Sequence, residues 1–148
     1  MLTGQTAIVT GSTSGIGLGI AERLAARGAN VVVNSYTDRT EDHAVAAGIA
    51  ARHGVEAVYV RADMAKPEEC RALVEQAVSR FGTLEILVNN AGIQHVAPVE
   101  EFPTERWDAI IAVNLSSAFH TIAAAVPPMR AAGSGRIVNI TSAHGPGA

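Results

Sequence analysis

Short runs of apolar residues alternate along the chain with longer segments in which apolar residues recur every three or four positions. The short runs are apolar throughout, which is typical of strands covered on both faces of a sheet. The longer segments have the spacing of helices that bury one side. The pattern predicts five strands, at residues 7–9, 31–33, 55–60, 84–88 and 136–140, with a helix in each interval.

Residues that begin or end helices mark the boundaries of the shorter helices. Ile16, Ile20 and Leu24 recur at four-residue spacing on one face, and Gly28 stands where that helix is expected to end. Pro67 suits the first turn of the third helix, because its fixed backbone angle fits there and its missing N–H costs nothing.

The last predicted helix is the longest. Thr104 is expected to cap its first turn, and Pro127-Pro128 to stop it, because proline lacks the N–H that continues a helix. Its apolar row comprises Trp107, Ile111, Leu115, Ile122 and Val126.

Apolar strands that alternate with helices predict an α/β fold. With right-handed crossovers, the expected topology is a doubly wound, Rossmann-like parallel sheet. A length of 148 residues fits a single domain, residues 1–148. Ligands of such sheets bind at the carboxyl ends of the strands, so we look for functional residues directly after each strand.

Composition narrows the classes of partner. The net charge is −3, and the eleven basic residues, of which only Lys66 is a lysine, are scattered, so we expect no nucleic-acid partner. Cys70 is the single cysteine, which excludes an internal disulfide and a cysteine-based metal site. The spacing of His, Asp and Glu predicts no metal site. The chain shows no secretory signal and no run of about 18 apolar residues, so we expect no membrane partner and a cytoplasmic protein.

A glycine-rich loop follows the first strand. Gly11, Gly15 and Gly17 are spaced Gly-x-x-x-Gly-x-Gly and lead directly into a helix. Such glycines allow backbone to approach a pyrophosphate, which the amides at a helix start attract. No Gly-Lys-Ser/Thr follows, which excludes a P-loop. A plain turn between strand and helix is the alternative interpretation.

Polar motifs follow the later strands. Asp63 follows the third, Asn89-Asn90-Ala91-Gly92 follows the fourth, Asn114 lies in the long helix, and Asn139-Ile140-Thr141-Ser142 closes the fifth. Together with the glycine loop, and in this order, they resemble the short-chain dehydrogenase/reductase family from residue 2 to about residue 145.

The resemblance implies a nicotinamide dinucleotide site. The glycine loop would face the pyrophosphate, Asp63 and the Met64 backbone the adenine, and the Asn90 segment the adenosine ribose. For Asp63, a helix cap before Pro67 is the alternative. The implied cofactor-binding residues are Gly11, Thr13, Gly15, Ile16, Gly17, Tyr36, Asp63, Met64, Asn90, Ala91 and Gly92.

The family's chemistry maps onto this chain in part. Ser142 matches the serine that orients the reacting oxygen, with a surface hydroxyl as the alternative, and Asn114 matches the asparagine whose carbonyl holds a relay water. Residues 1–148 contain no Tyr-x-x-x-Lys pair like that of the family, since neither Tyr36 nor Tyr59 is followed by a lysine four residues later. We therefore expect a domain truncated after the fifth strand, C-terminally incomplete and inactive alone.

The end of the second strand bears on the cofactor. NAD-binding folds usually carry an acidic residue there. In this chain residues 34–37 are Asn-Ser-Tyr-Thr, and the acidic residue Asp38 comes only after them. Family members that use NADP tend to have a basic residue where Ser14 stands. Arg39 leaves NADP as a possible cofactor, but we expect NAD to be preferred.

Three segments resemble the branch of the family that acts on D-3-hydroxybutyrate: residues 92–98, 102–107 and 142–145. Gln94 and His144 would then hold the carboxylate of a small hydroxy acid and Ser142 its hydroxyl. The implied function is hydride transfer between 3-hydroxybutyrate and NAD, in a full-length relative expected to be a homo-oligomer. Alternatives are an NADPH-dependent 3-oxoacyl reductase and a non-catalytic dinucleotide-binding fragment.

Overall fold

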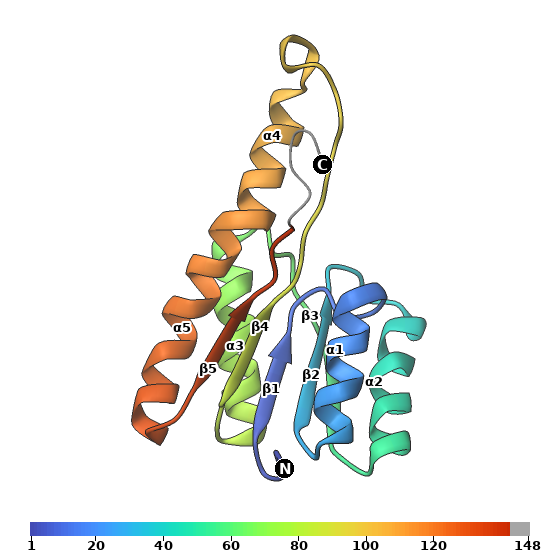
Figure 1. Cartoon of the computed structure of the whole chain (residues 1–148), viewed down its shortest axis with the longest axis vertical. Coiled ribbons are helices and arrows are strands. Elements are labelled where there is room, and N and C mark those ends of the chain that lie inside the picture. Colours follow the sequence, from blue (N-terminus) through green and yellow to red (C-terminus); the bar gives the residue numbers. More distant parts are fainter. Residues whose placement is uncertain (143–148) are drawn as a thin grey trace.

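A parallel sheet of five strands forms the centre of the molecule, a computed structural model that describes residues 1–142 (Figure 1). The strand order is β3-β2-β1-β4-β5. The strands are β1 (Thr6–Val9), β2 (Asn30–Ser35), β3 (Ala57–Arg61), β4 (Ile86–Asn89) and β5 (Arg136–Asn139). All neighbouring pairs are parallel, so the predicted doubly wound sheet is confirmed.

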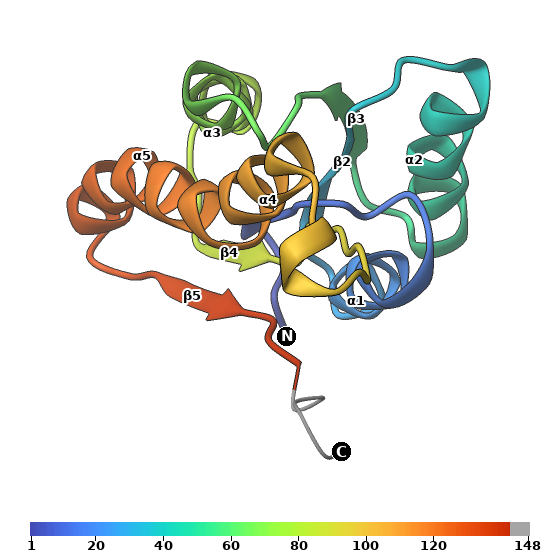
Figure 2. The ribbon, with the colours of Figure 1, turned by 90° about the horizontal axis from the view of Figure 1, so that it is seen from above.

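Helices lie on both sides of the sheet, although every residue of its edge strand β5 is exposed. Looking onto one end of the sheet, Figure 2 shows α1 and α2 on one side and α3 and α5 on the other. The helices are α1 (Gly15–Ala26), α2 (Thr40–His53), α3 (Pro67–Phe81), α4 (Thr104–Ile111) and α5 (Ser117–Ala132), with a short 3₁₀ turn, η1 (Val99–Glu101), before α4. Pro67 is the first residue of α3, as predicted.

Successive residues of the central strands face opposite helix layers. In β1, Ile8 packs into the cluster formed with α3 and α5, while Ala7 and Val9 pack toward α1 and α2. All three side chains are fully buried. This two-sided burial is why the central strands are apolar without alternation.

The direction of winding reverses between β1 and β4. From β1 the chain adds β2 and then β3 on one side, whereas β4 and β5 extend the sheet on the other. The loops after β1 and β4 therefore separate at the carboxyl edge and leave a crevice there, which is where open α/β sheets bind ligands.

The long helix departs from prediction at both ends. Thr104 is its first residue, preceded by Pro103 as the capping residue, and no side-chain cap bond forms, so the expected Thr104 cap is wrong. The helix also continues through Pro127-Pro128 to Ala132. The lost amide bond of Pro127 would have reached Ala123, and both residues are exposed, so water can satisfy the free carbonyl.

The middle of this helix widens into a π-helical turn, η2 (Ala112–Ser116), between α4 and α5. Beyond it, α5 buries a narrow face of small or adaptable side chains rather than the predicted apolar row. Those residues are Ser117, Thr121, Ala125 and Met129. Thr121 donates to Asn89 Oδ1 over 2.6 Å, and Asn89 Nδ2 donates to Asn139 Oδ1 over 2.9 Å. Asn89 therefore ties α5, β4 and β5 together.

Thr104–Ala132 is continuous enough and apolar enough to cross a membrane by length and composition alone. Mostly buried core helices of soluble proteins can meet the same criterion, but only 17% of the most apolar window of this helix is buried. In this fold α5 packs against α3 and β4 along the sheet.

Candidate functional site

A cavity of about 430 Å³ opens at the carboxyl edge of the sheet, where the winding reverses. It is bordered by the loops after β1, β2, β3 and β4 and by one side of the long helix. Its lining residues are Gly11, Thr13, Ser14, Asn34, Ser35, Tyr36, Ala62, Asp63, Met64, Ala65, Asn90, Ala91, Gly92, Ile93, Ala109 and Val113.

Most of the cofactor residues inferred from sequence meet in this cavity. Those that line it are Gly11, Thr13, Tyr36, Asp63, Met64, Asn90, Ala91 and Gly92. Gly15, Ile16 and Gly17 do not line it. They form the first turn of α1, beside the loop residues that do. Four separate loops thus converge on one crevice from distant parts of the chain.

The path of the glycine loop requires backbone angles that only glycine adopts readily. Gly11 and Gly15 both have φ of +58°, in the left-handed region. Gly17 serves a different purpose, because a Cβ there would lie closer than 3.0 Å to the Gly11 carbonyl oxygen and to Asn90 Nδ2. Glycine at 17 therefore lets α1 approach the loop closely.

The start of α1 has the properties of an anion site. Ser14 occupies the capping position, but its side chain makes no cap bond to the first turn. No acidic residue lies in that turn. Uncapped amides and the positive end of the helix dipole favour a pyrophosphate at this point. This donor set fits the pyrophosphate of a dinucleotide.

Asn90 and Thr10 lock the loops after β1 and β4 together. The amides of Asn90 and Ala91 both donate to Thr10 Oγ1 over 2.9 Å. The Asn90 side-chain Nδ2 donates to the carbonyls of Gly11 at 3.0 Å and Thr10 at 3.1 Å. Asn90 thus shapes the floor of the cavity through backbone bonds.

Asn34 is a site residue that the sequence analysis did not single out. Its Oδ1 accepts from the Gly11 amide at 3.1 Å, and its Nδ2 donates to Val60 O at 3.0 Å and to Ala62 O at 3.3 Å. The side chain is buried and joins the loops after β1 and β3. The change from three valines of a buried strand to a polar residue that is itself buried was the available signal.

Asp63 lines the cavity at the loop after β3. Its Oδ1 accepts from the Ala65 amide over 2.9 Å, and its own amide donates to Glu69 Oε1 over 3.0 Å. The capping position of α3 is taken by Lys66, so the alternative of a helix cap at Asp63 is not what the structure shows. The carboxylate instead shapes the turn beside the cavity.

Cations near Tyr36 are paired with acids. Arg61 donates to the Tyr36 carbonyl over 3.1 Å and forms an ion pair with Glu69 over 2.7 Å. Arg39 is paired with Asp42 over 3.3 Å. The residues found to line the cavity include no lysine or arginine within the described part of the chain.

Asn114 lies in the π-helical turn and faces the loop after β4. Its Oδ1 accepts from the Ile93 amide and its Nδ2 donates to the Ile93 carbonyl, both over 2.8 Å. Ile93 lines the cavity. Asparagine is unfavourable inside a helix, and this paired backbone contact gives Asn114 a local role.

Gln94 and Ser142, the substrate residues inferred from sequence that the structure describes, are not among the residues lining the cavity. Gln94 follows Ile93 and is exposed, with its carbonyl 3.5 Å from Arg106 Nη2. Ser142 follows β5 and is exposed at the same carboxyl edge of the sheet. His144 lies outside the described residues.

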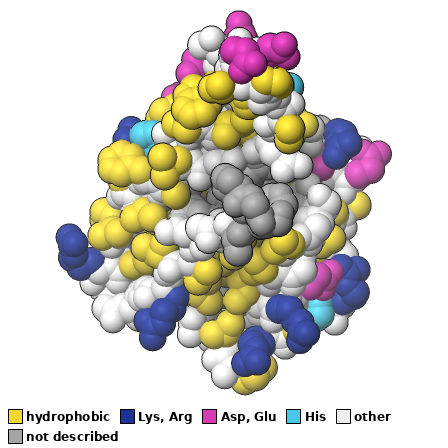
Figure 3. All heavy atoms as spheres, turned by 45° about the horizontal axis from the view of Figure 1, so that its top comes forward, with side chains coloured by type: hydrophobic (Ala, Val, Ile, Leu, Met, Phe, Trp, Pro, Cys, Tyr) yellow, Lys and Arg dark blue, Asp and Glu magenta, His cyan; other side chains and the backbone are white. Residues whose placement is uncertain are grey.

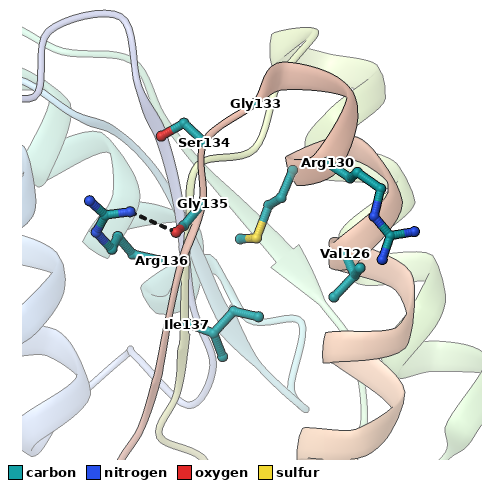
Figure 4. A pocket seen from close by; sticks show the side chains of 8 residues that line it. Val126, Arg130, Gly133, Ser134, Gly135, Arg136 and Ile137 are labelled. Atoms are coloured by element: carbon teal, nitrogen blue, oxygen red, sulfur yellow. Dashed lines mark hydrogen bonds between the residues drawn. The ribbon is translucent and has the colours of Figure 1, made fainter.

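A second cavity of about 510 Å³ lies at the other end of the sheet. Figure 4 shows it between the end of α5 and the loop that leads into β5, with Val126 and Ile137 facing into it and Arg136 bonded to the Gly135 carbonyl. It is the larger of the two, but it adjoins the amino end of β5. Because ligands of such sheets bind at the carboxyl edge, we assign the site to the smaller cavity.

The comparisons with known proteins agree with this geometry. The family model for short chain dehydrogenases matches residues 5–147. A D-beta-hydroxybutyrate dehydrogenase from Cupriavidus necator is 57% identical over 145 residues, and one from Rhizobium meliloti is 52% identical over 141. These alignments cover 98% and 95% of this chain but 55% of each relative, so the chain spans about half their length.

Solved structures give the same result. A metagenomic short-chain oxidoreductase in complex with NADP has a TM-score of 0.88 and 37% identity, over 95% of this chain and 63% of that one. An L-sorbose reductase from Gluconobacter frateurii, complexed with NADPH and L-sorbose, has a TM-score of 0.89 and 37% identity, over 93% of this chain and 52% of that one. The match along nearly the whole chain, with the converging glycine and asparagine loops, shows that the chain belongs to the short-chain dehydrogenase/reductase family.

Proposed function

We propose that this chain supplies the NAD-binding half, and part of the substrate site, of an enzyme that oxidises D-3-hydroxybutyrate in the cytoplasm. The observation that carries the proposal is the convergence of Gly11, Asp63 and Asn90 on one cavity at the carboxyl edge of the sheet. Identity of 57% and 52% to two D-beta-hydroxybutyrate dehydrogenases supports the choice of substrate.

The preference for NAD over NADP rests on charge. A 2′-phosphate on the adenosine ribose requires a cation, whereas a ribose hydroxyl does not. Arg39 and Arg61 are already paired with Asp42 and Glu69. Both cations are therefore neutralised at the ribose end, which favours NAD.

The roles proposed for the chain's own residues are positional. The first turn of α1 would bind the pyrophosphate, and the Asn90 segment would hold the adenosine ribose. Gln94 and His144 would orient the carboxylate of the hydroxy acid, and Ser142 would bind its reacting hydroxyl. When bound, NAD supplies the hydride acceptor.

Proton removal from the substrate hydroxyl requires a general base. The family pattern assigns this to a tyrosine with a lysine four residues later, and residues 1–148 contain no such pair. General acid–base catalysis contributes roughly 10²–10⁴-fold. We therefore propose that turnover depends on a tyrosine and a lysine supplied from outside these residues.

Titration of the chain with NAD, followed by calorimetry, tests the binding step. Turnover is tested in a chimera that joins residues 1–148 to the carboxyl-terminal part of the Cupriavidus necator relative. We expect NAD binding by the chain, and oxidation of D-3-hydroxybutyrate by the chimera but not by the chain alone.

Three results would overturn the proposal in distinct ways. Failure to bind either dinucleotide would remove the site. A chimera that reduces 3-oxoacyl thioesters with NADPH in preference would favour the reductase alternative. A folded chimera that binds NAD but turns over neither substrate would favour a purely dinucleotide-binding role.

A further inference from the structure

Arg39 lies in the loop between β2 and α2, three residues beyond Tyr36, which lines the cavity. An arginine at this place in a dinucleotide fold is suited to bind a 2′-phosphate on the adenosine ribose. The bond to Asp42, and to a smaller extent the charges of Glu41 and Tyr36, raise the pKa of Arg39. The loop therefore carries a cation close in sequence to Tyr36, which borders the cavity.

Asp42 holds this arginine through side chain and backbone together. Its Oδ1 accepts from Arg39 Nη2 over 3.3 Å, and its Oδ2 accepts from the Arg39 amide over 2.8 Å. Oδ2 also accepts from Thr37 Oγ1 over 2.7 Å. The Asp42 side chain is 1% exposed and the Arg39 side chain 61% exposed. A buried carboxylate therefore holds a guanidinium that faces solvent.

The same loop is held from its other side. The Tyr59 hydroxyl donates to the Thr37 carbonyl, and the Tyr59 ring packs edge-on against His43, with ring centroids 5.0 Å apart. His43 Nε2 lies 2.6 Å from Asp38 Oδ1. Both ends of residues 37–39 are thus anchored, which limits how far the loop can turn its arginine toward the ribose.

We propose that Asp42 is a specificity-determining residue: it holds Arg39 in an ion pair and so denies a cation to a 2′-phosphate in the cavity. The inference rests on the proposed function, since it presumes that a nicotinamide dinucleotide binds with its adenosine near Tyr36. Arg39 bound to Asp42 presents no net charge to the ribose. A 2′-hydroxyl is accepted there, whereas a 2′-phosphate meets a buried carboxylate that already holds the cation.

The test is Asp42→Asn, which keeps a side-chain oxygen that can accept the Thr37 and Arg39 amide bonds but removes the charge. Binding of NAD and NADP to the full chain is measured by calorimetry, with circular dichroism to show that the variant is folded. We expect the Kd for NADP to fall about ten- to a hundredfold, as one charge-assisted bond would allow. The Kd for NAD should change little. A loss of fold stability alone would weaken both cofactors together.

Arg39→Ala is the matched control. Added to Asp42→Asn, it should remove the gain in NADP affinity, because the freed guanidinium is what binds the phosphate. In the otherwise unchanged chain it should leave both affinities as they are. That single variant keeps Asp42, so it tests the inference even if Asp42→Asn does not fold.

The outcomes distinguish a failure of the proposed dinucleotide site from a failure of the role proposed for Asp42. If the unchanged chain binds neither NAD nor NADP, the proposed function fails. If it binds NAD but folded Asp42→Asn gains no NADP affinity, the role of Asp42 is wrong while the NAD site stands. Weaker NADP binding by Arg39→Ala alone would likewise show that Arg39 already serves the ribose.

Discussion

Gly17 sets the distance between α1 and the glycine loop. A Cβ at this position would lie within 3.0 Å of the Gly11 carbonyl oxygen and of Asn90 Nδ2. The first atom belongs to the backbone, and the second is held by hydrogen bonds to the Thr10 and Gly11 carbonyls, so neither can move away easily. We expect Gly17→Ala to displace the loop and to weaken NAD binding at least about tenfold, since bound groups tolerate little misplacement. Calorimetric titration of the variant with NAD measures this.

Gly19, in the same helix, provides the control. A Cβ at this position meets nothing within 4 Å. Gly19→Ala should leave NAD affinity unchanged and stabilise the helix by about 0.5–1 kcal/mol. Equal NAD affinity of Gly17→Ala and Gly19→Ala would contradict the close approach that we assign to Gly17.

We expect the stability of the folded protein to depend on pH through the Asp42 carboxyl. Its bonds from Thr37 and from the Arg39 amide lower the pKa of its carboxyl from 3.8 to about 2. A carboxyl with a lowered pKa in the folded state stabilises the protein above its unfolded pKa and loses that contribution as the pH falls. The melting temperature of the unchanged chain should therefore exceed that of Asp42→Asn at pH 5, and the difference should shrink between pH 4 and pH 2. A difference that stays constant over this window would contradict the assignment.

At the residue scale, sequence predicted where functional groups lie better than how they are connected. Eight of the residues inferred from motifs line the cavity, because motifs placed after strands must meet at one edge of a parallel sheet. Asn34 was not singled out, because its bonds to Gly11 and Val60 join three strand ends that are far apart in sequence. Gly17 lies behind the loop rather than in the cavity, which spacing alone cannot show.

At the scale of elements, Asn114 couples the long helix to the loop after β4. It makes two bonds of 2.8 Å to the backbone of Ile93 from within the π-helical turn. We expect Asn114→Ala to cost about 1–3 kcal/mol of local stability. Hydrogen exchange at the Ile93 amide should then be about tenfold faster or more. Exchange in the exposed variant Asp108→Ala, on α4, should be unchanged, and equal rates in both variants would show that Asn114 does not hold the loop.

The central strands were predictable because they are buried on both sides, so their apolar runs coincide with strands and the helical spacing between them with helices. β5 also follows its apolar run, although all its residues are exposed. The long helix was not predictable, since tertiary packing overrides local preference there. Pro127 is tolerated where its side of the helix faces solvent, and the face that packs on the sheet is the small-residue row with Thr121. The π-helical turn leaves no signature in the pattern of apolar residues, so the sequence did not predict it.

An exposed apolar row runs along α4, the π-helical turn and α5 on the surface of the molecule. Trp107 is 57% exposed, Leu115 66% and Phe119 64%, with Ile111 between them at 37%. Figure 3 shows hydrophobic side chains gathered over this side of the molecule. A contiguous exposed apolar row is typical of a surface that associates.

We therefore expect the chain to self-associate through this row. Sedimentation velocity over a range of concentrations should show a species larger than the monomer, and the double variant Leu115→Glu/Phe119→Glu should shift the distribution toward monomer, because charges placed in an apolar contact lose hydration without gaining partners. Val99→Glu is the matched control, since Val99 is 88% exposed but lies in η1, apart from the row. A concentration-independent monomer, or equal weakening by the control, would show that the row does not mediate association.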